Sequence, residues 1–218
     1  VTGEGIDMIK TFFNIVGKKV NKNVDNNLVE FHIDHVFNVY GFGMVLGGNL
    51  ISGTINVGDK LLVGPHSGTY EPIIIRSIYS KKIPLQQVSY GSYVCLGVKK
   101  IDTLNIKRGN VIISSKNEKL IVKKFSAKIN ILRTHSTTVK VGYEPMFHAY
   151  SIRQVVRIIN ISDKKNARGD VYNDNDNILR NGDIANVILE FKYHPEYLKT
   201  GARFILAEGK CKIVGEIL

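Results

Sequence analysis

The feature that most constrains the fold is a succession of short β-prone runs. From Leu28 onward, stretches rich in Val, Ile, Phe and Tyr alternate with Gly, Pro, Asn and Asp at intervals of roughly 8 to 12 residues. The connections contain residues that accept positive φ, or a proline that fixes φ, at Gly58-Asp59, Gly64-Pro65, Ser67-Gly68 and Arg108-Gly109-Asn110. Helical periodicity is nearly absent from this region. The pattern is typical of a β-barrel or a β-sandwich.

Two sets of strands are expected, separated by a polar break at residues 114–119. The first set covers residues 29–39, 43–50, 53–55, 60–63, 73–79, 92–98 and 111–113. The second set covers residues 123–132, 138–141, 146–150, 155–161, 184–191, 202–207 and 210–217. An Asn/Asp-rich stretch, 163–177, is expected to form an extended loop. The sequence therefore predicts an all-β protein of two consecutive antiparallel β-barrels, at residues 28–117 and 118–218.

One short helix is expected before the barrels. Its apolar residues recur at helical spacing, at Ile6, Ile9, Phe12, Phe13 and Val16. The next stretch, 18–27, is polar, so burial cannot offset the entropy of ordering it. We therefore expect a helix within residues 1–17 and a linker at 18–27.

Composition limits the class of protein. The 218 residues are 44% hydrophobic and 22% charged, which is ordinary for a globular chain with a real core. No run approaches the roughly 18 apolar residues of a membrane span, and the first residues lack a signal-peptide pattern. Cys95 and Cys211 lie in apolar segments without metal-ligand spacing, as expected of buried, reduced thiols. We expect a soluble cytoplasmic protein with no membrane partner.

The net charge of +11 favours a polyanionic partner, and nucleic acid is the leading class. The codon bias of an A/T-rich genome remains an alternative source of the Lys excess. Basic residues and tyrosine gather around one hairpin and after the following strand, where they would neutralise phosphates and stack on bases. A solvated edge strand protected by lysines is the alternative. The expected RNA-binding residues in this cluster are Arg76, Tyr79, Lys81, Lys82, Lys99 and Lys100.

The sequence contains no recognisable set of catalytic residues. Gly43 and Gly48 have the spacing of a phosphate-binding loop, but Asn49 and Leu50 stand where Lys and Ser/Thr would hold phosphate and magnesium. In a strand, the pair His32 and His35 would point to opposite faces. No nucleophile, base and orienting group share a motif. We therefore expect no catalytic residue, metal or cofactor in this chain.

Residues 36–61 read VFNVYGFGMVLGGNLISGTINVGDKL. This stretch resembles the opening of domain two of translational GTPases, the elongation factor Tu and elongation factor one-alpha group. In that pattern an apolar strand, a Gly-x-Gly turn and a second strand precede Gly-x-Ile/Leu-x-x-Gly-Asp/Glu. The resemblance implies structural turn glycines at Gly41, Gly43, Gly48, Gly53 and Gly58.

The second half resembles domain three of the same proteins, through segments that begin at residues 125, 142, 179, 203 and 214. The residues of this domain-three motif are Arg153, Gln154, Arg203, Glu208 and Gly209. Segments such as Ser151-Ile-Arg-Gln154 and Pro195-Glu-Tyr-Leu198 are most similar to the eukaryotic GTP-binding protein subfamily of elongation-factor-like GTPases. The helix within 1–17 resembles the C-terminal end of the family's GTPase domain.

The resemblance implies a division of labour. The chain lacks the family's Walker A, Asp-x-x-Gly and Asn-Lys-x-Asp motifs, so this chain alone is not expected to be an enzyme. A parent protein would bind GTP and Mg and hydrolyse GTP to GDP. In the family, domain two docks the aminoacyl end of tRNA and contacts the small ribosomal subunit. Domain three supports the T stem and packs against the GTPase domain.

The implied function is that of a non-catalytic tRNA- and ribosome-binding barrel module in translation elongation or in ribosome and mRNA surveillance. Its implied partners are aminoacyl-tRNA or another RNA, the ribosome and its own GTPase domain. Phe37 matches the aromatic residue that lines the family's terminal-adenosine pocket. Phe42, Ser77 and Ser80 stand where many relatives carry Arg, Glu and Arg. A protein-docking adaptor that recruits RNA-decay factors is the alternative.

Overall fold

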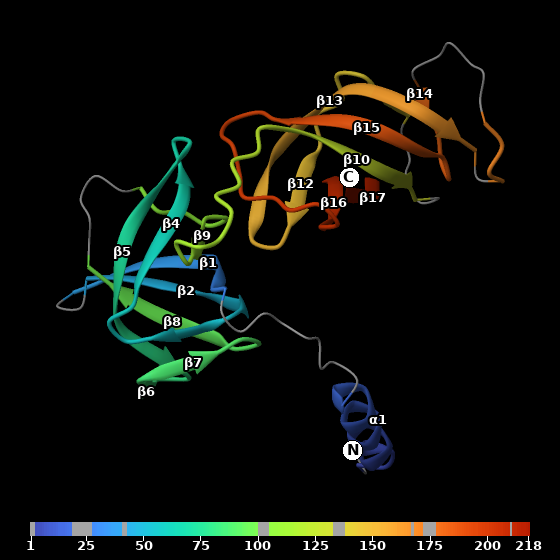
Figure 1. The fold of residues 1–218 in the computed structure, drawn as a ribbon. Coiled ribbons are helices and arrows are strands. Elements are labelled where there is room, and N and C mark those ends of the chain that lie inside the picture. Colours follow the sequence, from blue (N-terminus) through green and yellow to red (C-terminus); the bar gives the residue numbers. More distant parts are fainter. Residues whose placement is uncertain are drawn as a thin grey trace.

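The computed structural model describes residues 3–18, 28–40, 43–99, 105–132, 138–166, 168–171, 178–209 and 211–218. In these ranges, one helix, α1 (Ile6–Lys18), precedes seventeen strands that build two antiparallel barrels (Figure 1). This confirms the predicted all-β class and the short leading helix. The remainder of the predicted linker, residues 19–27, lies outside the described residues.

Barrel 1 is a ring of six strands with the order β4-β9-β1-β2-β8-β5, closed by pairing of β4 with β5. Its strands are β1 (Glu30–Val39), β2 (Gly43–Ser52), β4 (Lys60–His66), β5 (Thr69–Ser80), β8 (Tyr93–Val98) and β9 (Val111–Ile113). A short strand, β6 (Ile83–Leu85), extends β5, and β3 (Thr54–Asn56) pairs with β7 (Gln87–Ser89). Inward side chains such as Phe31, Leu46 and Leu96 are fully buried and fill the ring.

Barrel 2 is a closed ring with the order β10-β15-β13-β12-β16-β17. Its strands are β10 (Lys124–Ile131), β12 (Met146–Ala149), β13 (Ile152–Lys165), β15 (Ile184–Phe191), β16 (Arg203–Glu208) and β17 (Cys211–Ile217); β11 (Val139–Lys140) pairs with β14 (Ile178–Leu179) beside it. Burial alternates residue by residue along β10 and β15, because successive strand side chains point to opposite faces. At the centre, the Phe147 ring lies 4.9–5.7 Å from those of Phe125, Phe191 and Phe204.

Four strands, β6, β7, β13 and β14, differ from the sequence prediction. β6, β7 and β14, which have two or three residues each, were not predicted. β13 continues through Lys165, so residues 163–165 are strand where the sequence predicted a loop. The pairing of β13 with β15 has a register shift here, and Asp163 within it has positive φ. The side chain of Asn186 on β15 donates a hydrogen bond to the Asp163 carboxylate at 2.8 Å. These features allow β13 to continue as a strand through the polar segment. Residues 172–177 of the predicted loop lie outside the described residues.

The two barrels meet along a seam that joins residues far apart in sequence. Glu30 of barrel 1 is only 4% exposed and accepts hydrogen bonds from Tyr197 Oη (3.3 Å) and Lys199 Nζ of barrel 2. Its other carboxylate oxygen lies 2.8 Å from His32 Nε2. Ser151 Oγ of barrel 2 donates to Asp34 of barrel 1 at 2.6 Å. The seam is therefore a polar, hydrogen-bonded contact between the two barrels.

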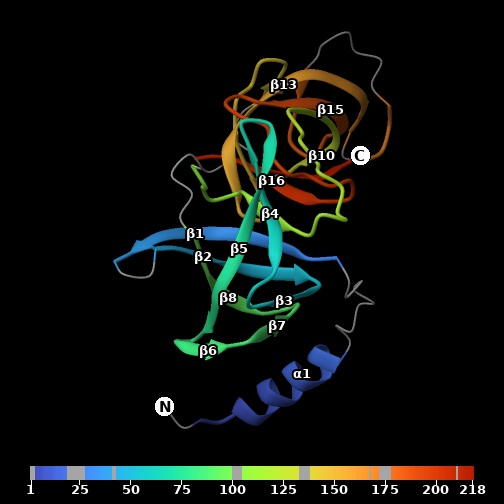
Figure 2. The same ribbon diagram turned by 60° about the vertical axis from the view of Figure 1, so that its left-hand side comes forward.

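Helix α1 lies apart from both barrels in two views of the chain (Figures 1 and 2). The side chains of its residues 6–16 are all exposed, including the apolar face formed by Ile9, Phe12 and Phe13. A face of this kind normally packs against another element. No helix among the described residues is long and apolar enough to cross a membrane.

Candidate functional site

The outer face of barrel 1 carries a regular grid of side chains. The strands β1, β2, β8 and β5 are consecutive neighbours, so their outward residues align across the sheet. One row runs from Phe37 through Val45 and Gly97 to Ser77. The next row runs from His35 through Gly47 and Cys95 to Tyr79. Each row contains one glycine, Gly97 in the first and Gly47 in the second, which leaves a gap among the side chains of the two middle strands.

The gap at Gly97 is part of a pocket of about 360 Å³. A Cβ at position 97 would lie 2.3 Å from Ser77 Oγ, so glycine at this position keeps the floor open. The pocket has an apolar side, a hydroxyl-bearing side and a basic mouth. Its lining residues are Val39, Val45, Ser77, Tyr79, Lys81, Lys82, Cys95 and Gly97. Three of the predicted RNA-binding residues, Tyr79, Lys81 and Lys82, therefore share this pocket.

The two lysines lie in the tight turn between β5 and β6. Lys81 and Lys82 have φ values of 49° and 71°, and both side chains are exposed. Arg76 is exposed on β5, and Lys99 is exposed just after β8, but neither lines the pocket. Lys100 lies outside the described residues. An apolar wall beside two ammonium groups suits a ligand that combines a flat ring with a phosphate.

Phe37 belongs to an aromatic row beside the pocket. Its ring is 47% exposed and stacks on His35, with 5.8 Å between centroids and 5° between planes. His35 Nδ1 lies 3.2 Å from Tyr93 Oη. Burial, followed by the charge of Asp34, raises the pKa of Tyr93, so its hydroxyl keeps its proton. Sequence reasoning missed His35 and Tyr93; the i, i+2 spacing of His35 and Phe37 on β1 was the available signal.

The predicted turn glycines have different roles. Gly43, Gly53 and Gly58 have φ of 87°, 78° and 96°, which favours glycine. Gly48 lies within β2 rather than in a turn, and a Cβ there would be 2.0 Å from the carbonyl oxygen of His32, so the close pairing of β1 with β2 requires glycine. Gly41 lies outside the described residues, as does Phe42.

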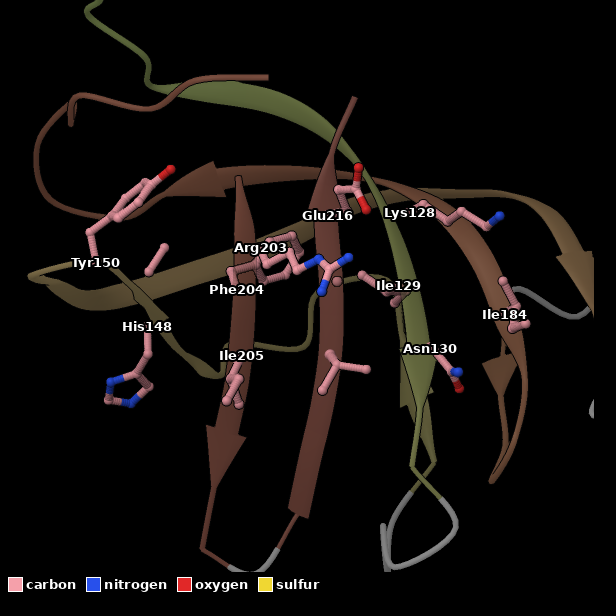
Figure 3. Close-up of a pocket in the computed structure, with 13 residues that line it drawn as sticks. Lys128, Ile129, Asn130, His148, Tyr150, Ile184, Arg203, Phe204, Ile205 and Glu216 are labelled. Atoms are coloured by element: carbon pink, nitrogen blue, oxygen red, sulfur yellow. The ribbon is translucent and has the colours of Figure 1, made fainter. Parts of the chain in front are cut away.

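Barrel 2 carries a broader, open hollow of about 800 Å³ on its outer face (Figure 3). Its charged row runs from Lys128 through Glu216 to Arg203 on neighbouring strands. The next row passes through the exposed apolar side chain of Ile205. Of the remaining domain-three residues, Glu208 and Gly209 are exposed at the end of the β16–β17 hairpin. Arg203 thus belongs to the hollow, whereas Glu208 and Gly209 do not line it.

Arg153 and Gln154 are adjacent in β13 but point to opposite faces. Gln154 is buried, and its amide group contacts His194 and Glu196. Arg153 is exposed and pairs in register with His148 of β12. Burial, and then the charges of Arg153 and Arg108, lower the pKa of His148. The domain-three motif therefore divides into a buried polar contact and a surface cation.

Cations from both barrels gather where the seam reaches the surface. Arg108 of barrel 1 donates from Nε to the carbonyl oxygen of Ser151 in barrel 2 at 3.1 Å. Within the described ranges, neither Arg108 nor Arg153 takes part in a salt bridge. Sequence reasoning missed Arg108 and His148, because their proximity depends on how the barrels dock. Unpaired guanidinium groups suit phosphate oxygens.

The described residues do not fit a nucleotide or a metal. Gly43 to Gly48, which have the spacing of a phosphate loop, lie within β2, whose backbone is paired with β1 and β8. Among the described residues, no group of three or more His, Cys, Asp and Glu side chains is placed to hold a metal ion. His32 is buried against Glu30, and His35 is exposed.

Comparison with known proteins gives the class. Residues 43–113 match the family model "Elongation factor Tu domain 2", and residues 120–217 match "Elongation factor Tu C-terminal domain". The chain therefore belongs to the elongation-factor-Tu-like family, as a pair of translational-GTPase barrel domains. Crystal structures of sup35 with GDP and with GMPPNP share the fold, with TM-scores of 0.76 and 0.77 and 21% sequence identity in both cases. The similarity covers 88% and 90% of this chain, and 47% and 48% of the two sup35 chains.

Relatives narrow the class to GTP-binding proteins and elongation factors. The chain is 34% identical to GTP-binding protein 1 of Xenopus laevis and 32% identical to GTP-binding protein 2 of Homo sapiens, in both cases over its whole length. It is 32% identical to elongation factor 1-alpha of Archaeoglobus fulgidus over 79% of its length. It spans 31%, 35% and 40% of these proteins, which is well under half of each. The resemblance to elongation-factor-like GTPases that the sequence motifs indicated is confirmed.

Proposed function

We propose that this chain is the RNA-binding barrel module of a GTP-binding translation factor, and that barrel 1 accepts the aminoacylated end of a tRNA. The terminal nucleoside would enter the pocket between β1, β2, β8 and β5, with Phe37 beside it. Lys81 and Lys82 would neutralise the phosphates that lead into the pocket. The cytoplasm, where translation takes place, is the compartment in which we expect this role.

The single observation that carries the proposal is the pocket itself. It combines an apolar wall at Val39 and Val45 with two lysines at its mouth, and all of its lining residues except Val39 lie in the segment that matches the elongation factor Tu domain 2 model. Its volume of about 360 Å³ falls in the range of small-ligand sites. Ser77 lines the pocket at the position where the family resemblance implies Glu, so the polar contacts to the nucleoside would come from hydroxyl groups, with Tyr79 Oη as another.

Further surfaces would extend the RNA path and connect it to GTP. The cations Arg108 and Arg153, at the outer edge of the seam, would bind the phosphate backbone beyond the terminal nucleotides. The exposed apolar face of α1 would pack within a GTPase domain of the parent protein. GTP and Mg would be held by that domain, and the domain arrangement that accompanies bound GTP would strengthen the hold of the barrels on RNA.

The test is the binding of aminoacyl-tRNA to the 218-residue chain, measured by fluorescence anisotropy over a range of salt concentrations. Substitution of both Lys81 and Lys82 by Gln should lower the slope of log affinity against log salt by about 0.7 for each lysine, as expected for contacts to a single strand. Phe37→Ala should weaken binding by about 5- to 100-fold without changing the slope, because stacking is independent of salt.

The matched control is Lys60→Gln, which removes one exposed lysine from β4, outside the four strands of the pocket. Its salt slope should stay at the wild-type value. Equal affinity and equal slope in all of these variants would contradict the proposed site. If Lys60→Gln weakened tRNA binding as much as the pocket substitutions do, the lysines would act through overall charge and not through a pocket.

A further inference from the structure

A buried carboxyl group lies beneath the loop by which barrel 1 meets barrel 2. Glu196 is only 2% exposed, and its Oε1 accepts a hydrogen bond from Gln154 Nε2 at 2.8 Å. Its Oε2 is buried and has no hydrogen-bond partner among the described residues. Gly109 of barrel 1 packs directly on it: a Cβ at Gly109 would lie 3.5 Å from Oε2 and 3.5 Å from Cα of Ile152. An ionised oxygen in this position would be costly.

The hydrogen bonds around Glu196 need one proton besides the two of the Gln154 amide, and either Nδ1 of His194 or the carboxyl group of Glu196 can carry it. The Gln154 amide nitrogen lies within 3.0 Å of three acceptors: Glu196 Oε1, His194 Nδ1 and the His194 carbonyl oxygen. An amide has two hydrogens, so it cannot serve all three. His194 Nδ1 also lies 3.2 Å from Glu196 Oε1. A proton shared between these two atoms completes the network, and burial favours its residence on the carboxyl group.

The other ionisable groups around the carboxyl offset a negative charge on Glu196 only in part. Lys107 approaches from the barrel 1 loop, and its own pKa is lowered by burial. Tyr70 faces from β5 of barrel 1 as a neutral hydroxyl, since burial and nearby negative groups raise its pKa. His194 of barrel 2 stays neutral, because burial, then the charge of Lys107 from barrel 1 and that of Lys123 from barrel 2, lower its pKa. Burial, in turn, raises the pKa of Glu196 to about 7, against the opposing influence of Lys107.

The other side of the seam behaves in the opposite way. Glu30 is held as a carboxylate by His32 and Lys199, whose hydrogen bonds and charges outweigh burial and lower its pKa to about 2. This contact stays charged and closed throughout the neutral range. The seam therefore combines a permanent ionic contact at Glu30 with a contact at Glu196 that depends on a proton.

We propose that Glu196, with His194 and Gln154, is a proton-operated hinge between the two barrels. With its proton, Glu196 lets the Gly109 loop rest on barrel 2. Without it, the buried charge draws in water or Lys107, the loop lifts, and barrel 1 rotates about the Glu30–Lys199 contact. The relative orientation of the proposed RNA surfaces on the two barrels then depends on pH.

The direction of the effect follows from linkage. The Glu196 pKa is raised in the docked state, so the docked contact is fully favoured below about pH 4.5 and is weakened as pH rises through about 7. Between these limits the ratio of lifted to docked loop increases about tenfold per pH unit, and above about pH 7 it is constant.

The test uses NMR on the 218-residue chain labelled with ¹³C at the glutamate carboxyl carbons and with ¹⁵N in the backbone. One glutamate resonance should titrate with a midpoint between about pH 5.5 and 7.5 and should be missing from Glu196→Gln. Residual dipolar couplings should fit a single orientation of the two barrels at about pH 5 and a different orientation at about pH 8. Glu196→Gln, which is always neutral, should keep the low-pH orientation at both values.

The matched control is Glu208→Gln, which removes an exposed carboxylate at the far end of the β16–β17 hairpin and should leave both readouts unchanged. A Glu196 midpoint below about pH 5.5 would overturn the proposal, because it would mean that Lys107 forms an ion pair with the carboxylate. An unchanged barrel orientation across the titration would also overturn it. If Glu196→Gln does not fold, the titration and couplings of the wild-type chain decide the question.

Discussion

Replacement of Glu30 by Gln should weaken both the seam and its resistance to acid. The carboxylate is 4% exposed and receives hydrogen bonds from Tyr197 and Lys199 of the other barrel. Its pKa is lowered from 4.5 to about 2. This difference corresponds to about 3 kcal/mol at most, and screening by water around the half-exposed Lys199 reduces it to about 2 kcal/mol at neutral pH.

The sign of the pH dependence is fixed by the direction of that shift. A lowered pKa contributes stability that is present above about pH 4.5 and is lost as pH falls toward about 2. Glu30→Gln should therefore lower the free energy of unfolding at neutral pH by about 2 kcal/mol and flatten its decline between those two pH values. Lys199 would be left without its carboxylate partner, which adds to the loss.

The assay is urea unfolding at a series of pH values, followed by a probe in each barrel. The unfolding midpoints of the two barrels should lie closer together in the wild type than in Glu30→Gln, because the variant removes a contact that links the barrels. Glu208→Gln is again the control, since it removes an exposed carboxylate. A stability within about 0.5 kcal/mol of wild type, or an unchanged acid dependence, would refute the reasoning.

Two further predictions concern the strands themselves. Gly48→Ala should lower the free energy of unfolding in urea by more than about 2 kcal/mol, because its Cβ would lie 2.0 Å from a backbone carbonyl oxygen. Gly47→Ala should cost far less, because a Cβ there meets only contacts of 3.4 Å or longer. Equal losses in the two variants would contradict the close pairing of β1 with β2 at Gly48. Phe147→Ala should lower the free energy of unfolding by about 3–5 kcal/mol, because it removes a fully buried ring that contacts three other phenylalanine rings. The measurement is urea unfolding followed by a probe in barrel 2. A loss below about 1 kcal/mol would show that the core is packed differently.

The sequence predicted the longer strands because they carry their own signal. Burial alternates over eight positions in β10, between exposed and buried residues, and in β15, between half-buried and buried residues, and turn residues mark the strand ends. β6, β7 and β14 have too few residues for such a pattern. The end of β13 was interpreted as loop because its composition is polar; its pairing with β15 depends on a bulge and on Asn186, which local composition does not reveal.

The candidate site was predictable only in part. Tyr79, Lys81 and Lys82 are neighbours along the chain, so their shared location follows from the hairpin. The pocket also needs Val45 and Gly97, which meet these residues only through the register of β2, β8 and β5. The seam could not be predicted, since Glu30 and Lys199 are 169 positions apart and become partners only when the barrels dock.

The most direct test of the account is to map where an RNA end touches the chain. Backbone and methyl NMR spectra of the 218-residue protein should be recorded with a short single-stranded RNA that has a free 3′ hydroxyl. The account predicts that Val39, Val45 and Gly97 shift together and that Phe37→Ala suppresses these shifts. Shifts confined to barrel 2, or pocket resonances that do not change at saturating RNA, would contradict it.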